Sequence, residues 1–205
     1  MVFEAEHINW NCPAGRRLDQ LAGLLPPTPH ADITVFGSAP LQLFLDDAFV
    51  SEDVDLFPPE ELFVHVQSLV EQHRLAKDMT PFYIQVCDAL AFKSTLDWRA
   101  RAVEVERHCH LFRIVHPWDV LVSKLQRLEE KDMAAFKLVL GKTGHPTEET
   151  ARGDMLLNTR ILWQELWGKS IDVRAAIIRP ALLRAEREYQ DFDPTLKERL
   201  GRIGR

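Results

Sequence analysis

Positive charge is missing from a long stretch of this sequence, since no lysine or arginine occurs between Leu18 and His73. Within that stretch, five carboxylates crowd ten residues: Asp46, Asp47, Glu52, Asp53 and Asp55. Negative charges that close repel one another unless a cation lies between them. Because the neighbouring sequence supplies no cation, the cluster predicts a bound divalent metal ion.

Cysteine is scarce as well. The three cysteines, Cys12, Cys87 and Cys109, are odd in number, far apart and without a CxxC pair, which argues against both a disulfide framework and a zinc site. No apolar run approaches the roughly 20 residues that a membrane helix needs. The acidic start of the chain lacks the order of a signal peptide, in which basic residues precede an apolar run. We therefore expect a soluble cytoplasmic protein.

The remaining composition is that of an ordinary globular protein. The chain has 205 residues, of which 46% are hydrophobic and 27% charged, with a formal net charge of −6. Residues 151–205 are mildly basic although the chain as a whole is acidic. A charge this small predicts a solvated helical surface rather than a nucleic-acid site.

Hydrophobic periodicity separates the chain into two parts. Strands are expected before about residue 115, and the spacing beyond Pro117 is helical. This order predicts an α+β fold with a mixed β-sheet and flanking helices over residues 1–116, followed by a C-terminal helical bundle over residues 117–205. The expected helices of the first part cover residues 14–25, 40–47 and 60–73, and its strands cover residues 32–36, 53–57, 82–86, 103–106 and 111–115.

Two of the clustered carboxylates share a strand. Asp53 and Asp55 flank Val54 in the strand expected over residues 53–57, and residues two apart on a strand point to the same face. Upstream, the expected strand over residues 32–36 ends at Gly37-Ser38. Flexible backbone with exposed amides at a strand end suits a close approach to a triphosphate.

The order of these two motifs carries a family resemblance. Phe36-Gly37-Ser38 followed by Asp53-Val54-Asp55 resembles the nucleotidyltransferase superfamily with the DNA polymerase β-like fold. The resemblance implies transfer of a nucleoside monophosphate from a nucleoside triphosphate to an acceptor hydroxyl, with release of pyrophosphate. It also implies that Asp53 and Asp55 are catalytic residues that hold Mg²⁺ or Mn²⁺, and that Gly37 and Ser38 bind the nucleotide.

A second resemblance lies downstream. The segment over residues 116–125, with Asp119 and Lys124 in Asp-x4-Lys spacing and Asp132 further on, is similar to bacterial AbiEii-type nucleotidyltransferases, which are related to toxins. The resemblance implies that Lys124 is catalytic and neutralises phosphate charge, and that Asp119 and Asp132 orient it or bind the nucleotide. It further implies a phosphate contact at Lys93, an RNA or protein acceptor, and an antitoxin protein as partner.

One residue departs from the superfamily pattern. The superfamily places a third carboxylate on the following strand, where it helps to deprotonate the attacking hydroxyl, and here Gln85 stands at that place. Asp88 lies three residues on, and by strand parity it faces the opposite side from Gln85. The departure fits a slow enzyme, a base from elsewhere, or a site that binds nucleotide without turnover.

Three interpretations of function remain open. The first is a metal-dependent nucleotidyltransferase, and the second is a nucleotide-binding or protein-interaction module with a degenerate site, which Gln85 favours. A hydrolase that uses the same metal pair is the third. Separately, His108 and His110 are expected to share one strand face with Glu104 and Glu106, which indicates a solvated strand surface rather than a metal pair.

Overall fold

The computed structural model describes residues 3–92, 94, 98–125 and 132–143. The chain divides into two compact units. The first, here called the sheet unit, comprises Val2–Phe92 and Trp98–Val120. The second unit comprises Met1, Lys93–Asp97 and Leu121–Arg205. The helix α5, Pro117–Leu125, runs across the division, and α6, Asp132–Thr143, belongs to the second unit.

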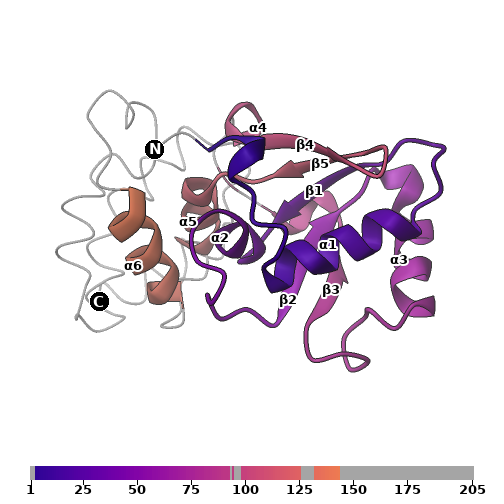
Figure 1. The fold of residues 1–205 in the computed structure, drawn as a ribbon, viewed down its shortest axis with the longest axis horizontal. Coiled ribbons are helices and arrows are strands. Elements are labelled where there is room, and N and C mark those ends of the chain that lie inside the picture. The colour runs from indigo at the N-terminus through magenta and orange to yellow at the C-terminus, as the bar shows by residue number, and fades with distance from the viewer. Residues whose placement is uncertain (1–2, 93, 95–97, 126–131, 144–205) are drawn as a thin grey trace, which may run out of the picture. The chain divides into compact units, whose positions relative to one another are not determined.

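The sheet unit is built on one mixed sheet with the strand order β3-β2-β1-β5-β4 (Figure 1). The central strand β1 pairs antiparallel with β2 and parallel with β5. The edge strand β3 is parallel to β2, and the other edge strand, β4, is antiparallel to β5. The strands are β1 (Asp32–Phe36), β2 (Asp53–Phe57), β3 (Tyr83–Val86), β4 (Val103–Arg107) and β5 (His110–Ile114).

Helices surround this sheet. The helix α1 begins where Pro13 follows Cys12, whose Sγ accepts a hydrogen bond from the Gly15 amide, so that the first turn is capped. Proline also lies in the first turn of α2. The helices of the sheet unit are η1 (Ala5–His7), α1 (Pro13–Leu24), α2 (Ala39–Phe44), η2 (Glu60–Leu62), α3 (Phe63–Gln72), η3 (Ala89–Ala91) and α4 (Trp98–Arg101), where η marks a 3₁₀-helix.

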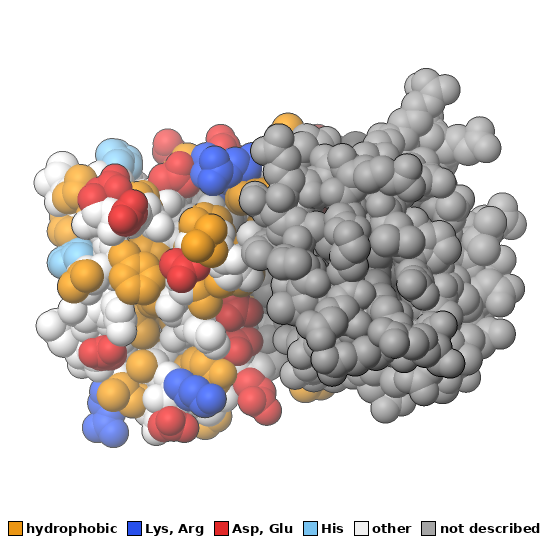
Figure 2. Space-filling view, turned by 180° about the vertical axis from the view of Figure 1, so that it is seen from behind, with side chains coloured by type: hydrophobic (Ala, Val, Ile, Leu, Met, Phe, Trp, Pro, Cys, Tyr) orange, Lys and Arg blue, Asp and Glu red, His pale blue; other side chains and the backbone are white. Residues whose placement is uncertain are grey.

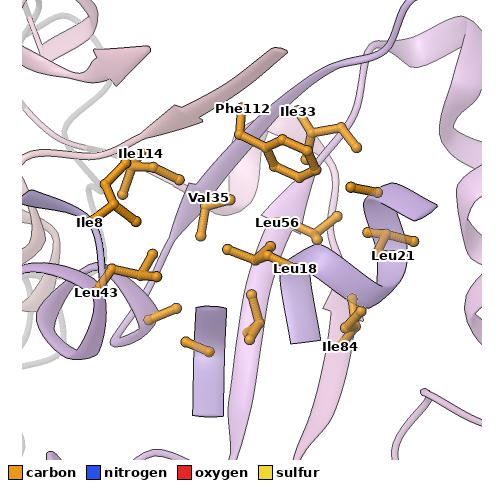
Figure 3. Close-up of a cluster of buried hydrophobic side chains, with 14 of the residues drawn as sticks. Ile8, Leu18, Leu21, Ile33, Val35, Leu43, Leu56, Ile84, Phe112 and Ile114 are labelled. Carbon is orange, nitrogen blue, oxygen red and sulfur yellow. The ribbon is translucent and has the colours of Figure 1, made fainter. Parts of the chain in front are cut away.

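The hydrophobic core lies on one face of the sheet. Alternate strand residues such as Ile33, Val35 and Leu56 point to this face, and Leu18 and Leu21 of α1 pack against them (Figure 3). All five side chains have no measurable exposure. Each such burial stabilises the fold by about 1.5–3 kcal/mol before entropy is counted, so this face fixes the register of the strands and, with it, the orientation of the opposite face.

The opposite face is partly covered by an aromatic cluster. The rings of Phe36 and Phe57 lie 5.7 Å apart, Phe36 and Phe92 lie 5.3 Å apart, and Phe92 and Trp98 lie 5.2 Å apart. Figure 2 shows the molecule from the side opposite to that of Figure 1, and acidic side chains are interspersed with apolar ones over its described part. The strand residues that point to this face are therefore not part of the hydrophobic core.

The predicted strands are largely confirmed. The strands at residues 32–36 and 53–57 have the predicted bounds, and the mixed sheet with flanking helices is present. The predicted helix at 60–73 instead begins as the 3₁₀-helix η2, and α3 starts only at Phe63. Of the predicted helical bundle, α5 and α6 are described, and residues 144–205 lie outside the described part. No helix among the described residues is long and apolar enough to cross a membrane.

The interpretation of the histidine pair is wrong. His108 and Cys109 both have left-handed backbone, with φ of 48° and 68°, and form the two-residue turn between β4 and β5. His110 is buried, and its Nδ1 accepts a hydrogen bond from the Ala31 amide at 3.2 Å. The two predicted strands thus form a hairpin, in which His108 and His110 do not share a solvated face.

Candidate active site

The two carboxylates predicted to bind metal lie on the sheet face opposite to the core. Val54 between them is fully buried in the core, so strand alternation directs Asp53 and Asp55 to the other side. Both aspartates are only partly buried. Their strand β2 is flanked by β1 on one side and β3 on the other, so neighbouring strands can place further groups beside each carboxylate.

Gly37 meets one of these carboxylates directly. Phe36 pairs with Asp55 across β1 and β2, and Gly37 follows with a φ of +65°. A Cβ atom built on Gly37 would lie 2.0 Å from Asp55 Oδ2, which is far inside van der Waals contact. Only glycine fits both the left-handed backbone and this close approach. The predicted Gly-Ser and Asp-x-Asp motifs are therefore brought together, with Ser38 next in the chain at the start of α2.

Tyr83 contacts the other carboxylate. It pairs with Asp53 across the parallel strands β2 and β3, and its Oη donates a hydrogen bond to Asp53 Oδ2 at 3.1 Å. Burial, followed by the negative charge of Asp53 and the hydrogen bond to it, raises the pKa of Tyr83 to about 12. Tyr83 therefore stays protonated at neutral pH and acts as a donor. The sequence analysis missed this residue, whose only signal was its place at the start of the strand that carries Gln85.

Gln85 occupies the place where the superfamily has its third acid. It pairs with Asp55 on the neighbouring strand, and its side chain is exposed. Asp88 does not replace it, because its carboxylate accepts a hydrogen bond from the Leu90 amide at 2.8 Å and caps η3. Within the described ranges, the strand beside the two aspartates therefore presents an amide and not a base.

The donors fit a hard divalent cation that arrives with a nucleotide. Among the described residues there is no group of three or more His, Cys, Asp or Glu side chains that could hold a metal ion. Mg²⁺ is commonly bound by only one or two carboxylates, together with substrate phosphates and water. Asp53 and Asp55 supply that number of oxygen ligands on one face, so the pair suits Mg²⁺ bound jointly with a triphosphate.

A pocket of about 250 Å³ opens beside the edge strand β3. Its lining includes Tyr83 and Gln85, which pair with Asp53 and Asp55, together with Glu71 of α3 and Lys77 of the segment before β3. The pocket thus lies between α3 and the edge strand β3, and the two aspartates are not among its lining residues.

Asp119 makes a buried ion pair within the sheet unit. Arg101 holds its carboxylate through two hydrogen bonds of 2.9 Å and 2.8 Å, and only 1% of the Asp119 side chain is exposed, against 30% of Arg101. Burial lowers the pKa of the neighbouring His116 to about 4, so that imidazole is neutral at neutral pH. The structure thus ties Asp119 to α4, and its predicted part in nucleotide binding stays a prediction.

Removing Arg101 is expected to destabilise the sheet unit more than removing Asp119. Arg101→Ala leaves a carboxylate that is 1% exposed without its bidentate donor, which typically costs about 3–5 kcal/mol. Asp119→Asn leaves an arginine that is partly in water, so the loss is smaller. Urea unfolding of the two variants measures the difference. Arg99→Ala, an exposed neighbour on the same helix, serves as the control, and equal losses for Arg101 and Arg99 would contradict the role of the ion pair.

Lys124 and Asp132, both predicted site residues, contact each other in the second unit. Lys124 Nζ donates to Asp132 Oδ1 at 3.2 Å, and the two side chains are 10% and 1% exposed. An exposed surface lysine is therefore ruled out for Lys124. The predicted roles of Asp132 in orienting Lys124 or binding the nucleotide, and of Lys124 in contacting phosphate, stay predictions. Lys93 lies outside the described residues.

Comparison with known proteins assigns the chain to a protein family. No curated protein and no solved structure matches the chain. A family model described as "Nucleotidyltransferase of unknown function (DUF6036)" matches residues 16–137. The match covers more than half of the chain and includes Gly37, Asp53 and Asp55 as well as Lys124 and Asp132. This chain therefore belongs to the DUF6036 family of nucleotidyltransferases.

Proposed function

We propose that this protein is a metal-dependent nucleotidyltransferase that moves a nucleoside monophosphate from a nucleoside triphosphate to an acceptor hydroxyl. The observation that carries the proposal is the contact between the two motifs, in which Gly37 leaves no space for a Cβ atom against Asp55. The hydrophobic core does not require a glycine this close to a carboxylate. Because Gly37 has no side chain, the space beside Asp55 Oδ2 stays open for the cation.

In this proposal, each predicted site residue binds either the metal ion or the nucleotide. Asp53 and Asp55 would hold Mg²⁺ or Mn²⁺, which when bound supplies charge neutralisation for the triphosphate. Gly37 and Ser38 bind the phosphates from the end of β1. Lys93, Lys124 and Asp119 take the phosphate-contacting and nucleotide-binding roles that the family resemblance implies, and Lys124 Nζ donates to Asp132 Oδ1. The ammonium of Lys124 stabilises the negative charge that develops on the phosphates during transfer.

The acceptor follows from the resemblance to AbiEii-type proteins. That resemblance rests on the segment from His116 to Leu125 with Asp132 beyond it. We propose an acceptor hydroxyl on RNA or on a protein, and a toxin-like activity that an antitoxin protein restrains.

A second candidate function is a module that binds nucleotide without transferring it. The observation that favours it is Gln85, which lies opposite Asp55 where a general base would be needed. An amide side chain cannot take up the proton of the attacking hydroxyl. Transfer therefore requires that the substrate complex or another part of the chain accept that proton.

The test separates binding from turnover. Calorimetric titration with each nucleoside triphosphate, with and without Mg²⁺, should show binding only when the metal is present. Incubation with labelled triphosphates and total cellular RNA or protein should then release pyrophosphate and label the acceptor. Binding without pyrophosphate release supports the module. Formation of a nucleoside diphosphate or monophosphate without acceptor labelling supports the hydrolase, and absence of binding refutes all three.

A further inference from the structure

Tyr83 contacts the candidate metal pair in a way that neither sequence motif accounts for. Its hydroxyl donates to Asp53 Oδ2 at 3.1 Å, and the strand register places the two residues directly opposite each other. We propose that Tyr83 is a positioning residue that holds the Asp53 carboxylate in the orientation needed to bind the divalent metal of the nucleotide. This inference rests on the function proposed above.

The two aspartates are held by different means. Asp55 lies against Gly37, so packing restricts its carboxylate. Asp53 lies two residues away, towards the start of β2, and its carboxylate is approached by the hydroxyls of Tyr83 and Ser51. A carboxylate restrained only by its own torsion angles rotates among several orientations, so a hydrogen bond to one oxygen is needed to select one of them.

The hydrogen bonds around Asp53 leave one of its oxygens for a cation. Tyr83 occupies Oδ2, whereas Ser51 Oγ lies 3.5 Å from Oδ1 and 3.0 Å from the Asp53 carbonyl oxygen. The single proton of a hydroxyl goes to the acceptor at hydrogen-bonding distance, here the carbonyl, since 3.5 Å is long for such a bond. Oδ1 is thus the oxygen that Tyr83 leaves free to bind the metal. Residues that hydrogen-bond to metal ligands orient those ligands in the same way in other proteins.

Tyr83→Phe removes this hydrogen bond and keeps the ring. We expect the dissociation constant of a Mg²⁺ complex with a non-hydrolysable nucleoside triphosphate analogue, measured by calorimetry, to rise by about 10-fold, at the lower end of the effect of losing such a partner. KM for the Mg²⁺–nucleotide complex should rise in the same way, with kcat at saturation unchanged. Tyr189→Phe is the matched control, because Tyr189 is the one other tyrosine of the chain.

A spectroscopic signal separates positioning from a structural role. With 3-fluorotyrosine incorporated, the chain gives two ¹⁹F resonances, and Tyr83→Phe identifies that of Tyr83. We expect this resonance to shift when the Mg²⁺–analogue complex is added, and the shift to vanish in Asp53→Asn. Unchanged urea unfolding of Tyr83→Phe with weakened binding supports positioning.

Other outcomes overturn the inference. If the wild type binds the complex and Tyr83→Phe binds it equally well, the positioning role fails while the proposed function stands. If the wild type does not bind it at all, both fail. If incubation with a hydrolysable triphosphate adds the mass of a nucleoside monophosphate to the wild type but not to Tyr83→Phe, Tyr83 is an acceptor and not a positioning residue.

Discussion

Replacing Asp53 and Asp55 together by asparagine is expected to abolish Mg²⁺-dependent binding of nucleoside triphosphates while the sheet unit stays folded. The amides keep the shape of the carboxylates but lose the negative charge that binds Mg²⁺. The free energy of unfolding should stay the same or rise slightly, because the repulsion between two acids on one strand face is relieved. Calorimetry measures the binding and urea unfolding measures the stability.

A matched control removes the same charge from exposed positions. Asp47 and Glu52 are both exposed and lie in the segment before β2, so Asp47→Asn with Glu52→Gln changes the net charge equally. That variant should keep its affinity for the Mg²⁺–nucleotide complex. Unchanged affinity in the Asp53 and Asp55 variant would refute the metal assignment, and its unfolding would show that the two carboxylates are structural.

The site residues that could be predicted from the sequence are those whose positions depend only on residues nearby in the chain. Alternation on a strand places Asp53 and Asp55 on one face whatever the rest of the chain does, and the strand at 53–57 has the predicted bounds. The apolar run from Ile33 to Phe36 is bounded by turn signals, and β1 ends where glycine interrupts it. In both cases the evidence lies within a few residues of the element.

The residues that the sequence did not reveal depend on pairing between distant segments. Tyr83 reaches Asp53 only because β3 is parallel to β2 and in this register. Arg101 reaches Asp119 only because α4 and α5 meet, and an arginine 18 residues before an aspartate has no recognisable spacing. The shared face expected for His108 and His110 was wrong for a related reason, since the left-handed turn at His108 and Cys109 contains no glycine that would have marked it.

Gln85 limits which group can accept the proton of the acceptor hydroxyl. Its place opposite Asp55 means that the described sheet presents an amide beside the two aspartates proposed to bind the metal. Tyr83, with a pKa raised to about 12, is a donor at neutral pH and cannot act as a base there. If transfer occurs, deprotonation of the acceptor depends on the metal-bound substrate complex or on the acceptor itself, so the rate should depend strongly on the acidity of the acceptor hydroxyl.

Substituting Gly37 by alanine is expected to destroy nucleotide binding and to destabilise the fold. The left-handed backbone at φ +65° costs a residue with a Cβ atom about 1–2 kcal/mol. The Cβ would also lie 2.0 Å from Asp55 Oδ2, so the carboxylate has to move, and overpacking of this kind typically adds about 1–3 kcal/mol. Calorimetric titration and urea unfolding should both show the loss.

Gly23→Ala provides the matched control, because it adds the same methyl group to a glycine that needs no special backbone. Gly23 lies exposed in α1, and a Cβ there meets nothing within 4 Å. Alanine in a helix is favoured over glycine by about 0.5–1 kcal/mol, so this variant should gain stability and bind nucleotide normally. If Gly37→Ala also kept its stability and its Mg²⁺-dependent binding, the close contact between the two motifs would have no part in holding the nucleotide.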